Sequence, residues 1–331
     1  MNVLRIAIPD LVSPSYFPAI AAVELGFFKQ EGLDATVELL FPVTRTYEEL
    51  RDGRLDFVAG AAHAPLYAFR NWNGCRLLAA LSQHMYWFLV LRKDIGARRG
   101  DLASVKGLRI GAAPGPVDGL KRMLVESGID PEREVTIGPV PGSAEAGASF
   151  GVAAAKALEA GKLDGFWANG MGAEVAVRSG VGTLVLDARR GDGPAPARDY
   201  TFAAFVATQK TIEQQPALVA GAVRALVGAQ QALKREPGRA TDAAKRLFPA
   251  AEAGLIAGLI RRDAPFYDPA ISPRSVDALN GFARDLGILT AAASYEQVVA
   301  TGFQHLWKHP LPNPPLQGEG GLRNPPPQGE G

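Results

Sequence analysis

The chain contains 331 residues, of which 47% are hydrophobic and 21% are charged, so it can bury a sizeable core and wholesale disorder is excluded. Its 35 Lys and Arg residues nearly balance its 34 Asp and Glu residues, which excludes a broad basic surface for nucleic acid or for anionic membranes. The single cysteine, Cys75, excludes an internal disulfide bond, and no apolar run reaches the roughly 20 residues of a membrane-spanning helix.

The amino-terminal segment predicts the first strand of an α/β sheet. Residues 3–8 are apolar and β-branched and end before Pro9. Ser15 is expected to cap the helix that follows, with Pro18 in its first turn. The segment lacks the basic region, the apolar stretch and the cleavage site of an export signal. Either the true start lies upstream, or the protein stays in the cytoplasm.

Helices and strands then alternate along the chain. "DATVEL" has the alternation of a strand, "TYEELRDG" is helical, and residues 55–61 form a buried strand that ends in small residues. This order predicts a largely parallel sheet with helices on both faces.

An internal repeat indicates two such units. "LRIAI" at residues 4–8 returns as "LRIGA" at 108–112, and "LRDGRLDFVAG" at 50–60 returns as "LEAGKLDGFWANG" at 158–170, at nearly the same offset. The shared pattern L-x-x-G-[RK]-L-D describes a helix that ends at a glycine of positive φ, with a leucine packed beneath that end, before the chain enters a strand. The repeat predicts two lobes of similar α/β design.

The lobes are expected to be discontinuous in the chain. Lobe 1 comprises residues 1–90 and 200–309, and lobe 2 comprises residues 91–199, with strand-like segments within 82–94 and 199–210 as the two connections.

The last third of the chain is expected to be mostly helical. Helices begin at Pro216 and at Ser272, and a capping box of Ser294 and Gln297 opens a last helix that ends near Trp307. Residues 310–331 hold two copies of a Pro/Gly-rich unit with no periodic apolar face, and they are predicted to be a disordered tail.

Four loops are predicted to meet in a cleft between the lobes, because ligands of open α/β sheets bind outside the carboxyl ends of the strands. These loops are residues 9–16, 59–64, 112–118 and 167–172. They offer hydroxyls near a helix start, close backbone approach at glycine, and aromatic surface. The candidate ligand-binding residues are Ser13, Tyr16, His63, Trp87, Pro114, Gly115, Asp118, Trp167 and Asn169.

The segment "FPAIAAVELGFFKQEGLDATVEL" closely resembles the opening of the solute-binding proteins of ABC importers in the NMT1/THI5-like group (SsuA/THI5-like, NitT/TauT-type), which includes binders of alkanesulfonates, nitrate and pyrimidines. "LASVKGLRIGAAPG" resembles the entry to the second lobe of that group, and the likeness extends over residues 3–307. The residues that match the group's turn motif are Gly26, Phe27, Phe28, Glu31, Gly32 and Leu33.

The resemblance implies the type II periplasmic-binding fold, in which two lobes joined by a two-strand hinge close on a small-molecule ligand. It also implies a monomer without catalytic activity, a periplasmic location, and the permease of an ABC importer as partner, with no direct insertion into the membrane.

The residues leave the class of ligand open. Asp118 in the cleft would disfavour a sulfonate or nitrate by charge repulsion, whereas the Tyr, Trp and His content favours an aromatic or nitrogen-containing heterocyclic compound. Alkanesulfonate or nitrate is the alternative class of ligand. A further alternative is an enzyme on the same fold that acts on a small aromatic or pyrimidine compound, with His63 or Asp118 as base.

Metal and cofactor chemistry is not indicated. The chain has neither a G-x-S-x-G nucleophile motif nor a P-loop, and "GAAPGPVDG" lacks the spacing of a dinucleotide loop. The sequence therefore predicts no cofactor, no metal and no enzyme activity. The histidines, which show no metal-ligand spacing, are His63, His84, His305 and His309.

Overall fold

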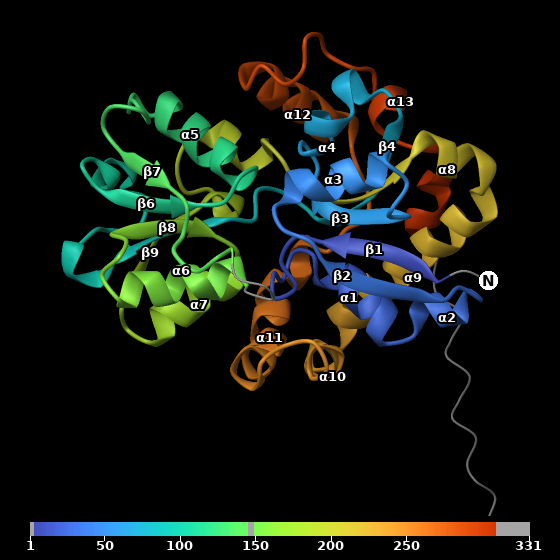
Figure 1. Cartoon of the computed structure of the whole chain (residues 1–331), viewed down its shortest axis with the longest axis horizontal. Coiled ribbons are helices and arrows are strands. Elements are labelled where there is room, and N and C mark those ends of the chain that lie inside the picture. Colours follow the sequence, from blue (N-terminus) through green and yellow to red (C-terminus); the bar gives the residue numbers. More distant parts are fainter. Residues whose placement is uncertain (1–2, 145–148, 309–331) are drawn as a thin grey trace, which may run out of the picture.

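Two five-stranded sheets form two lobes that lie side by side in the computed structural model, which describes residues 3–144 and 149–308 (Figure 1). The predicted tail, residues 310–331, lies outside the described residues. The first sheet has the strand order β2 (Ala35–Leu39), β1 (Leu4–Ile8), β3 (Phe57–Ala61), β10 (Ala203–Thr208) and β4 (Cys75–Ser82). The second has the order β7 (Thr136–Gly138), β6 (Arg109–Ala112), β8 (Gly165–Ala168), β5 (Phe88–Arg92) and β9 (Gly182–Asp187).

Each sheet is mixed, and four of its five strands run in the same direction, in agreement with the predicted largely parallel sheet. In the first sheet β1 pairs in parallel with β2 and β3, and in the second β6 pairs in parallel with β7 and β8. The strand that arrives from the other lobe runs antiparallel to both of its neighbours, β10 in the first sheet and β5 in the second. The chain thus crosses between the sheets twice, through residues 83–87 and 188–202.

Helices cover the faces of both sheets, as the alternation predicts. In the second lobe α5 lies on one side of the sheet and α6 and α7 lie on the other (Figure 1). The α-helices before β9 are α1 (Phe17–Glu24), α2 (Phe27–Gln30), α3 (Val43–Arg51), α4 (Pro65–Ala68), α5 (Pro116–Glu126), α6 (Phe150–Glu159) and α7 (Gly170–Arg178). Those of the last third are α8 (Gln209–Gln214), α9 (Pro216–Arg235), α10 (Arg239–Ala244), α11 (Ala250–Asp263), α12 (Pro273–Asp285) and α13 (Tyr295–Val298).

The expected last helix is shorter than its sequence pattern suggests. The capping box of Ser294 and Gln297 is present, and α13 ends at Val298 instead of near Trp307. Val299 is extended, and the Ala300 N–H donates to the carbonyl of Leu77 on β4 at 2.9 Å. β4 is an edge strand, so its outer backbone groups are available to partners from outside the sheet, and this tertiary hydrogen bond competes with continuation of the helix.

The internal repeat corresponds to one local structure built twice. α3 and α6 each end before a glycine in the left-handed region, Gly53 with φ 74° and Gly161 with φ 67°. Leu50 and Leu158, three residues earlier in each motif, are buried under the helix end. Only glycine adopts this backbone conformation without steric cost, which is why the motif keeps glycine at this position in both lobes.

The aspartate of each repeat, Asp56 or Asp164, accepts a hydrogen bond from the backbone of the neighbouring strand, β1 or β6. The backbone N–H of Arg5 donates to Asp56 at 2.8 Å, and that of Arg109 donates to Asp164 at 3.0 Å. The Arg109 side chain adds hydrogen bonds of 2.8 and 2.9 Å to Asp164, whereas the Arg5 side chain bonds to Glu38 instead.

The Asp164→Asn variant is expected to lose about 1–2 kcal/mol of unfolding free energy at pH 7, and the matched Asp56→Asn variant less. Hydrogen bonds from Arg109 hold the pKa of Asp164 at about 2, below its usual range. This stabilisation is therefore present above about pH 4 and is lost as the pH falls towards 2. Urea denaturation at pH 7 and at about pH 2 measures both variants, and equal losses at pH 7 would contradict the assignment.

Candidate ligand-binding cleft

A small cavity lies between the lobes at the carboxyl ends of β1, β6 and β8. Its volume is about 30 Å³, the room of one or two water molecules, so the lobes stand closed and must separate to admit a larger solute. The first lobe contributes Pro9, Asp10, Ser13, Tyr16, Phe41 and Val43 to its lining. The crossing segment and second lobe contribute Trp87, Ala113, Pro114, Pro116, Phe150, Trp167, Ala168 and Asn169.

Most of the predicted site residues meet at this cavity. Those that line it are Ser13, Tyr16, Trp87, Pro114, Trp167 and Asn169. His63, Gly115 and Asp118 lie on the same interlobe boundary but do not line the cavity. The backbone at Gly115 approaches the other lobe so closely that an added Cβ would lie 2.6 Å from Val43 Cγ1.

Asp10 joins the two lobes across the cleft. It lies two residues after the end of β1, and its side chain accepts hydrogen bonds from Ser149 Oγ at 3.1 Å, the Gly151 N–H at 3.4 Å and Asn169 Nδ2 at 2.6 Å, all in the second lobe. Burial raises the pKa of Asp10 to about 6, although these hydrogen bonds and one from the Val12 N–H lower it. Asp10 was not among the predicted site residues, although its place just after the first strand, within the predicted loop 9–16, could have indicated it.

The start of α7 fixes the direction of the Asn169 side chain. Its Oδ1 accepts hydrogen bonds from the N–H groups of Met171 at 2.9 Å and Gly172 at 3.1 Å, which is an N-cap arrangement. The amide nitrogen must then point away from the helix, and it donates to Asp10.

Aromatic rings from both lobes close the cleft. Phe41 stacks on Phe150 of the other lobe, with ring centroids 5.9 Å apart and an interplanar angle of 20°. Trp87 and Trp167 lie 6.4 Å apart, and Trp167 Nε1 donates to the carbonyl of Pro116 at 2.9 Å. Such rings supply apolar area with defined geometry, which suits a flat organic solute.

Three residues of the loop after β1, Ser13, Ser15 and Tyr16, carry hydroxyl groups that are buried at the boundary between the lobes. Tyr16 shares a hydrogen bond of 2.7 Å with the hydroxyl of Tyr86, and burial raises its pKa well above the usual range. The predicted cap at Ser15 is wrong: α1 has no side-chain cap, and Ser15 Oγ accepts from Arg189 of the other lobe at 2.9 Å. Ser13 Oγ is buried and has no hydrogen-bond partner among the described residues.

His63 and Asp118 form a second polar contact between the lobes. His63 is fully buried, its Nδ1 lies 3.0 Å from Thr201 Oγ1, and its Nε2 lies 3.5 Å from Asp118 Oδ2. The hydroxyl of Tyr67 donates to the same carboxylate at 2.6 Å. Asp118 is thus engaged by its neighbours outside the cavity.

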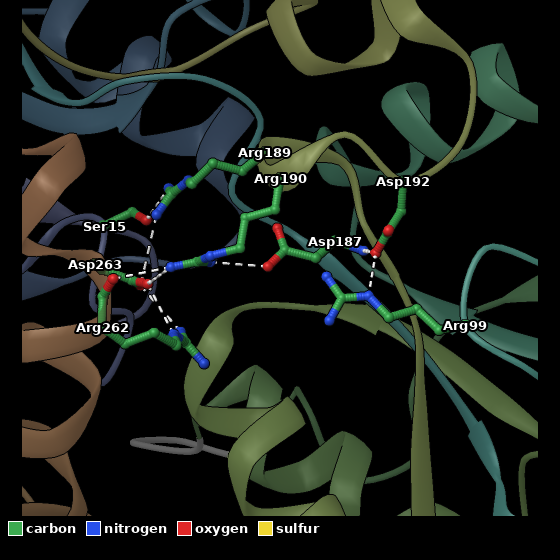
Figure 2. A network of polar contacts seen from close by, with 8 residues as sticks. All are labelled: Ser15, Arg99, Asp187, Arg189, Arg190, Asp192, Arg262 and Asp263. Atoms are coloured by element: carbon green, nitrogen blue, oxygen red, sulfur yellow. Dashed lines mark hydrogen bonds and ion pairs between the residues drawn. The ribbon is translucent and has the colours of Figure 1, made fainter.

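A network of buried ion pairs joins the segment after β9 to the end of α11, away from the cavity (Figure 2). Arg189, whose side chain is 0% exposed, follows β9, and its Nη1 lies 3.5 Å from Asp263 at the end of α11. Arg262 donates to the same carboxylate at 2.8 and 3.0 Å, and Arg190 donates to the Arg262 carbonyl at 2.9 Å. Burial raises the pKa of Asp263, but the charges of Arg189 and Arg262 outweigh it and hold the pKa below its usual range.

The described part of the chain contains no group of three or more His, Cys, Asp or Glu side chains placed to hold a metal ion. None of the described helices combines the length and the apolar character needed to cross a membrane.

The sequence and the fold of this chain are similar to those of known proteins. The family model described as "NMT1/THI5 like" matches residues 13–240. No curated protein sequence matches the chain at a significant level.

Solved structures share the fold over nearly the whole chain. A protein from Bordetella bronchiseptica RB50 has a TM-score of 0.72 and 17% identity, covering 93% of this chain and 97% of that one. The alkanesulfonate-binding protein SsuA from Xanthomonas axonopodis pv. citri, bound to MOPS, has a TM-score of 0.66 and 16% identity, covering 92% and 98%. The desulfurization enzyme DSZB has a TM-score of 0.63 and 17% identity, covering 92% and 98%. The predicted type II periplasmic-binding fold is confirmed.

Proposed function

The chain belongs to the NMT1/THI5-like family, and from this premise we propose that it is the solute-binding protein of an ABC importer whose lobes close on a small organic solute. One observation carries the proposal: loops from the strand ends of both lobes converge on a common cavity at the boundary between the lobes. The partner of the closed form is the permease of the importer, and the protein acts as a monomer in the periplasm.

Opening and closing is proposed as the working motion. The lobe that holds the first sheet rotates against the lobe that holds the second, about the crossing segments 83–87 and 188–202. The cavity of about 30 Å³ opens in this motion, and a bound solute replaces contacts that now join the lobes directly.

The proposed ligand is an aromatic or nitrogen-containing heterocyclic compound. Among the residues that the structure describes, the cavity lining holds several aromatic rings and contains neither Lys nor Arg. An alkanesulfonate or nitrate would meet no positively charged side chain in this lining, so that alternative class is less well supported.

A screen of small organic solutes is expected to find a ligand that raises the melting temperature by about 5 °C at 100 times its Kd, because it binds only the folded protein. Thermal-shift measurement with isothermal titration of each hit tests this expectation. A broad panel without any stabilising solute would contradict it.

Enzyme activity is the second candidate function. It is favoured by the likeness to DSZB and by His63, whose buried Nε2 faces Asp118 without a hydrogen-bond partner among the described residues. The same panel separates the two functions: a solute recovered unchanged after incubation supports binding, whereas steady consumption of one compound supports catalysis.

A further inference from the structure

Asp10 is a buried carboxylate whose hydrogen-bond donors are all neutral groups. It is 7% exposed, and the donors are Val12 N–H, Gly151 N–H, Ser149 Oγ and Asn169 Nδ2. Within the described ranges, no Lys, Arg or His forms an ion pair with it. A buried ionised carboxylate is costly unless a positive charge accompanies it, and the described lining of the small cavity beside Asp10 supplies neither Lys nor Arg.

Aromatic rings surround the cavity that Asp10 borders. The negative face of an aromatic ring attracts a cation within about 6 Å, most strongly where water is excluded. Asp10 is also the only Asp, Glu, Lys or Arg side chain in the described lining of this cavity. The rings are those of Tyr16, Phe41, Trp87, Phe150 and Trp167.

Building on the proposed function, we propose that the solute carries a positively charged nitrogen, a protonated amine or an ammonium group, which forms an ion pair with Asp10 between these rings. The ion pair would supply the missing positive charge, and the rings would hold the organic part of the solute. Asp10 is then the residue that selects the charge of the ligand.

The position of Asp10 also works against anions. Its carboxylate bonds to the Gly151 N–H and to Ser149, the N-cap of α6, where free amides and the helix dipole favour negative charge. An anionic solute would have to displace this carboxylate or lie beside it, and like charges repel strongly at short range in a buried site. Sulfonates and nitrate are therefore disfavoured.

The ionisation of Asp10 makes the binding pH-dependent. With a pKa of about 6, its carboxyl group is ionised at pH 7.5 and mostly protonated at pH 5. The titratable groups around it are Tyr16 at the start of α1, and Lys156, Lys162 and Glu252 in an open groove of about 520 Å³ on its other side. Both lysines are exposed to solvent.

Three probes of similar size test the charge preference: benzylamine, benzyl alcohol and benzenesulfonate. At pH 7.5 benzylamine is expected to bind the wild-type protein at least about tenfold tighter than benzyl alcohol, with benzenesulfonate weakest. The Asp10→Asn variant should lose about tenfold in affinity for benzylamine and change less than about twofold for benzyl alcohol. Asp242→Asn, which removes the same charge from exposed α10, should bind all three as the wild type does.

Lowering the pH from 7.5 to 5 gives a readout that needs no variant. Benzylamine stays protonated over this range, and its affinity should fall about tenfold as Asp10 takes up a proton, while that of benzyl alcohol stays level. If Asp10→Asn fails to fold, the pH dependence of benzylamine binding to the wild-type protein tests the ion pair with Asp10 on its own.

The outcomes separate this inference from the proposed function. Equal affinities for benzylamine and benzyl alcohol, or benzylamine binding that neither Asp10→Asn nor pH alters, would overturn the inference. So would a wider screen in which only neutral or anionic solutes bind, although the proposed function would then stand. If no screened solute binds the wild-type protein, both are overturned.

Discussion

Replacing Asp263 with Ala is expected to lower the free energy of unfolding by about 3–5 kcal/mol, because it leaves a buried arginine without its counter-charge. Asp263 is 1% exposed and lies 3.5 Å from Arg189, and it also accepts two hydrogen bonds from Arg262. Chemical denaturation measures the loss. The network joins the end of α11 to the segment after β9, so the variant should also favour separation of the lobes, which small-angle scattering would show as a larger radius of gyration (Figure 2).

Two further variants serve as controls for Asp263→Ala. Arg99→Ala removes an exposed ion pair with Asp192 and should cost less than about 1 kcal/mol. Adding Arg189→Met to Asp263→Ala removes the uncompensated charge, and the double variant should be more stable than Asp263→Ala alone. A loss for Asp263→Ala no larger than that for Arg99→Ala would show that the network does not stabilise the closed protein.

Replacing Trp167 with Ala is expected to cost about 3–5 kcal/mol of unfolding free energy and to weaken solute binding by more than about tenfold. Its side chain is fully buried on β8 and lines the cavity, so the substitution removes both core packing and a wall of the cleft. Trp167→Phe keeps an aromatic ring but loses the hydrogen bond to the Pro116 carbonyl and part of the packed ring area, so a smaller cost of about 1–3 kcal/mol is expected.

Trp72 provides the matched control for this pair of effects. It is 1% exposed in the first lobe and does not line the cavity. Trp72→Ala should therefore lose a similar amount of stability but retain the affinity for any solute found in the screen. Binding is measured by isothermal titration at a temperature where both variants remain folded. Equal losses of affinity in the two variants would mean that Trp167 acts through stability alone.

Much of the fold could be predicted from the sequence because its determinants are local. The motif that ends at Gly53 and Gly161 combines a helix terminus, a packed leucine and an aspartate within a few residues, and the structure builds it twice. The start of α9 at Pro216 and the cap of α12 at Ser272 depend on equally short segments. Where the prediction was wrong, at Ser15 and after Val298, a partner distant in sequence took the place of the local one.

The two α/β lobes and the strand-end loops that meet between them could be predicted because periodicity, glycine conformation and capping act over a few residues. The chemistry of the cleft, in contrast, depends on contacts between residues far apart in the chain. Asp10 meets Asn169 across 159 positions, and Ser15 meets Arg189 across 174, so neither pair leaves a local pattern to recognise. The charge of the cleft depends on which side chains closure brings together and buries, and burial is a property of the whole fold.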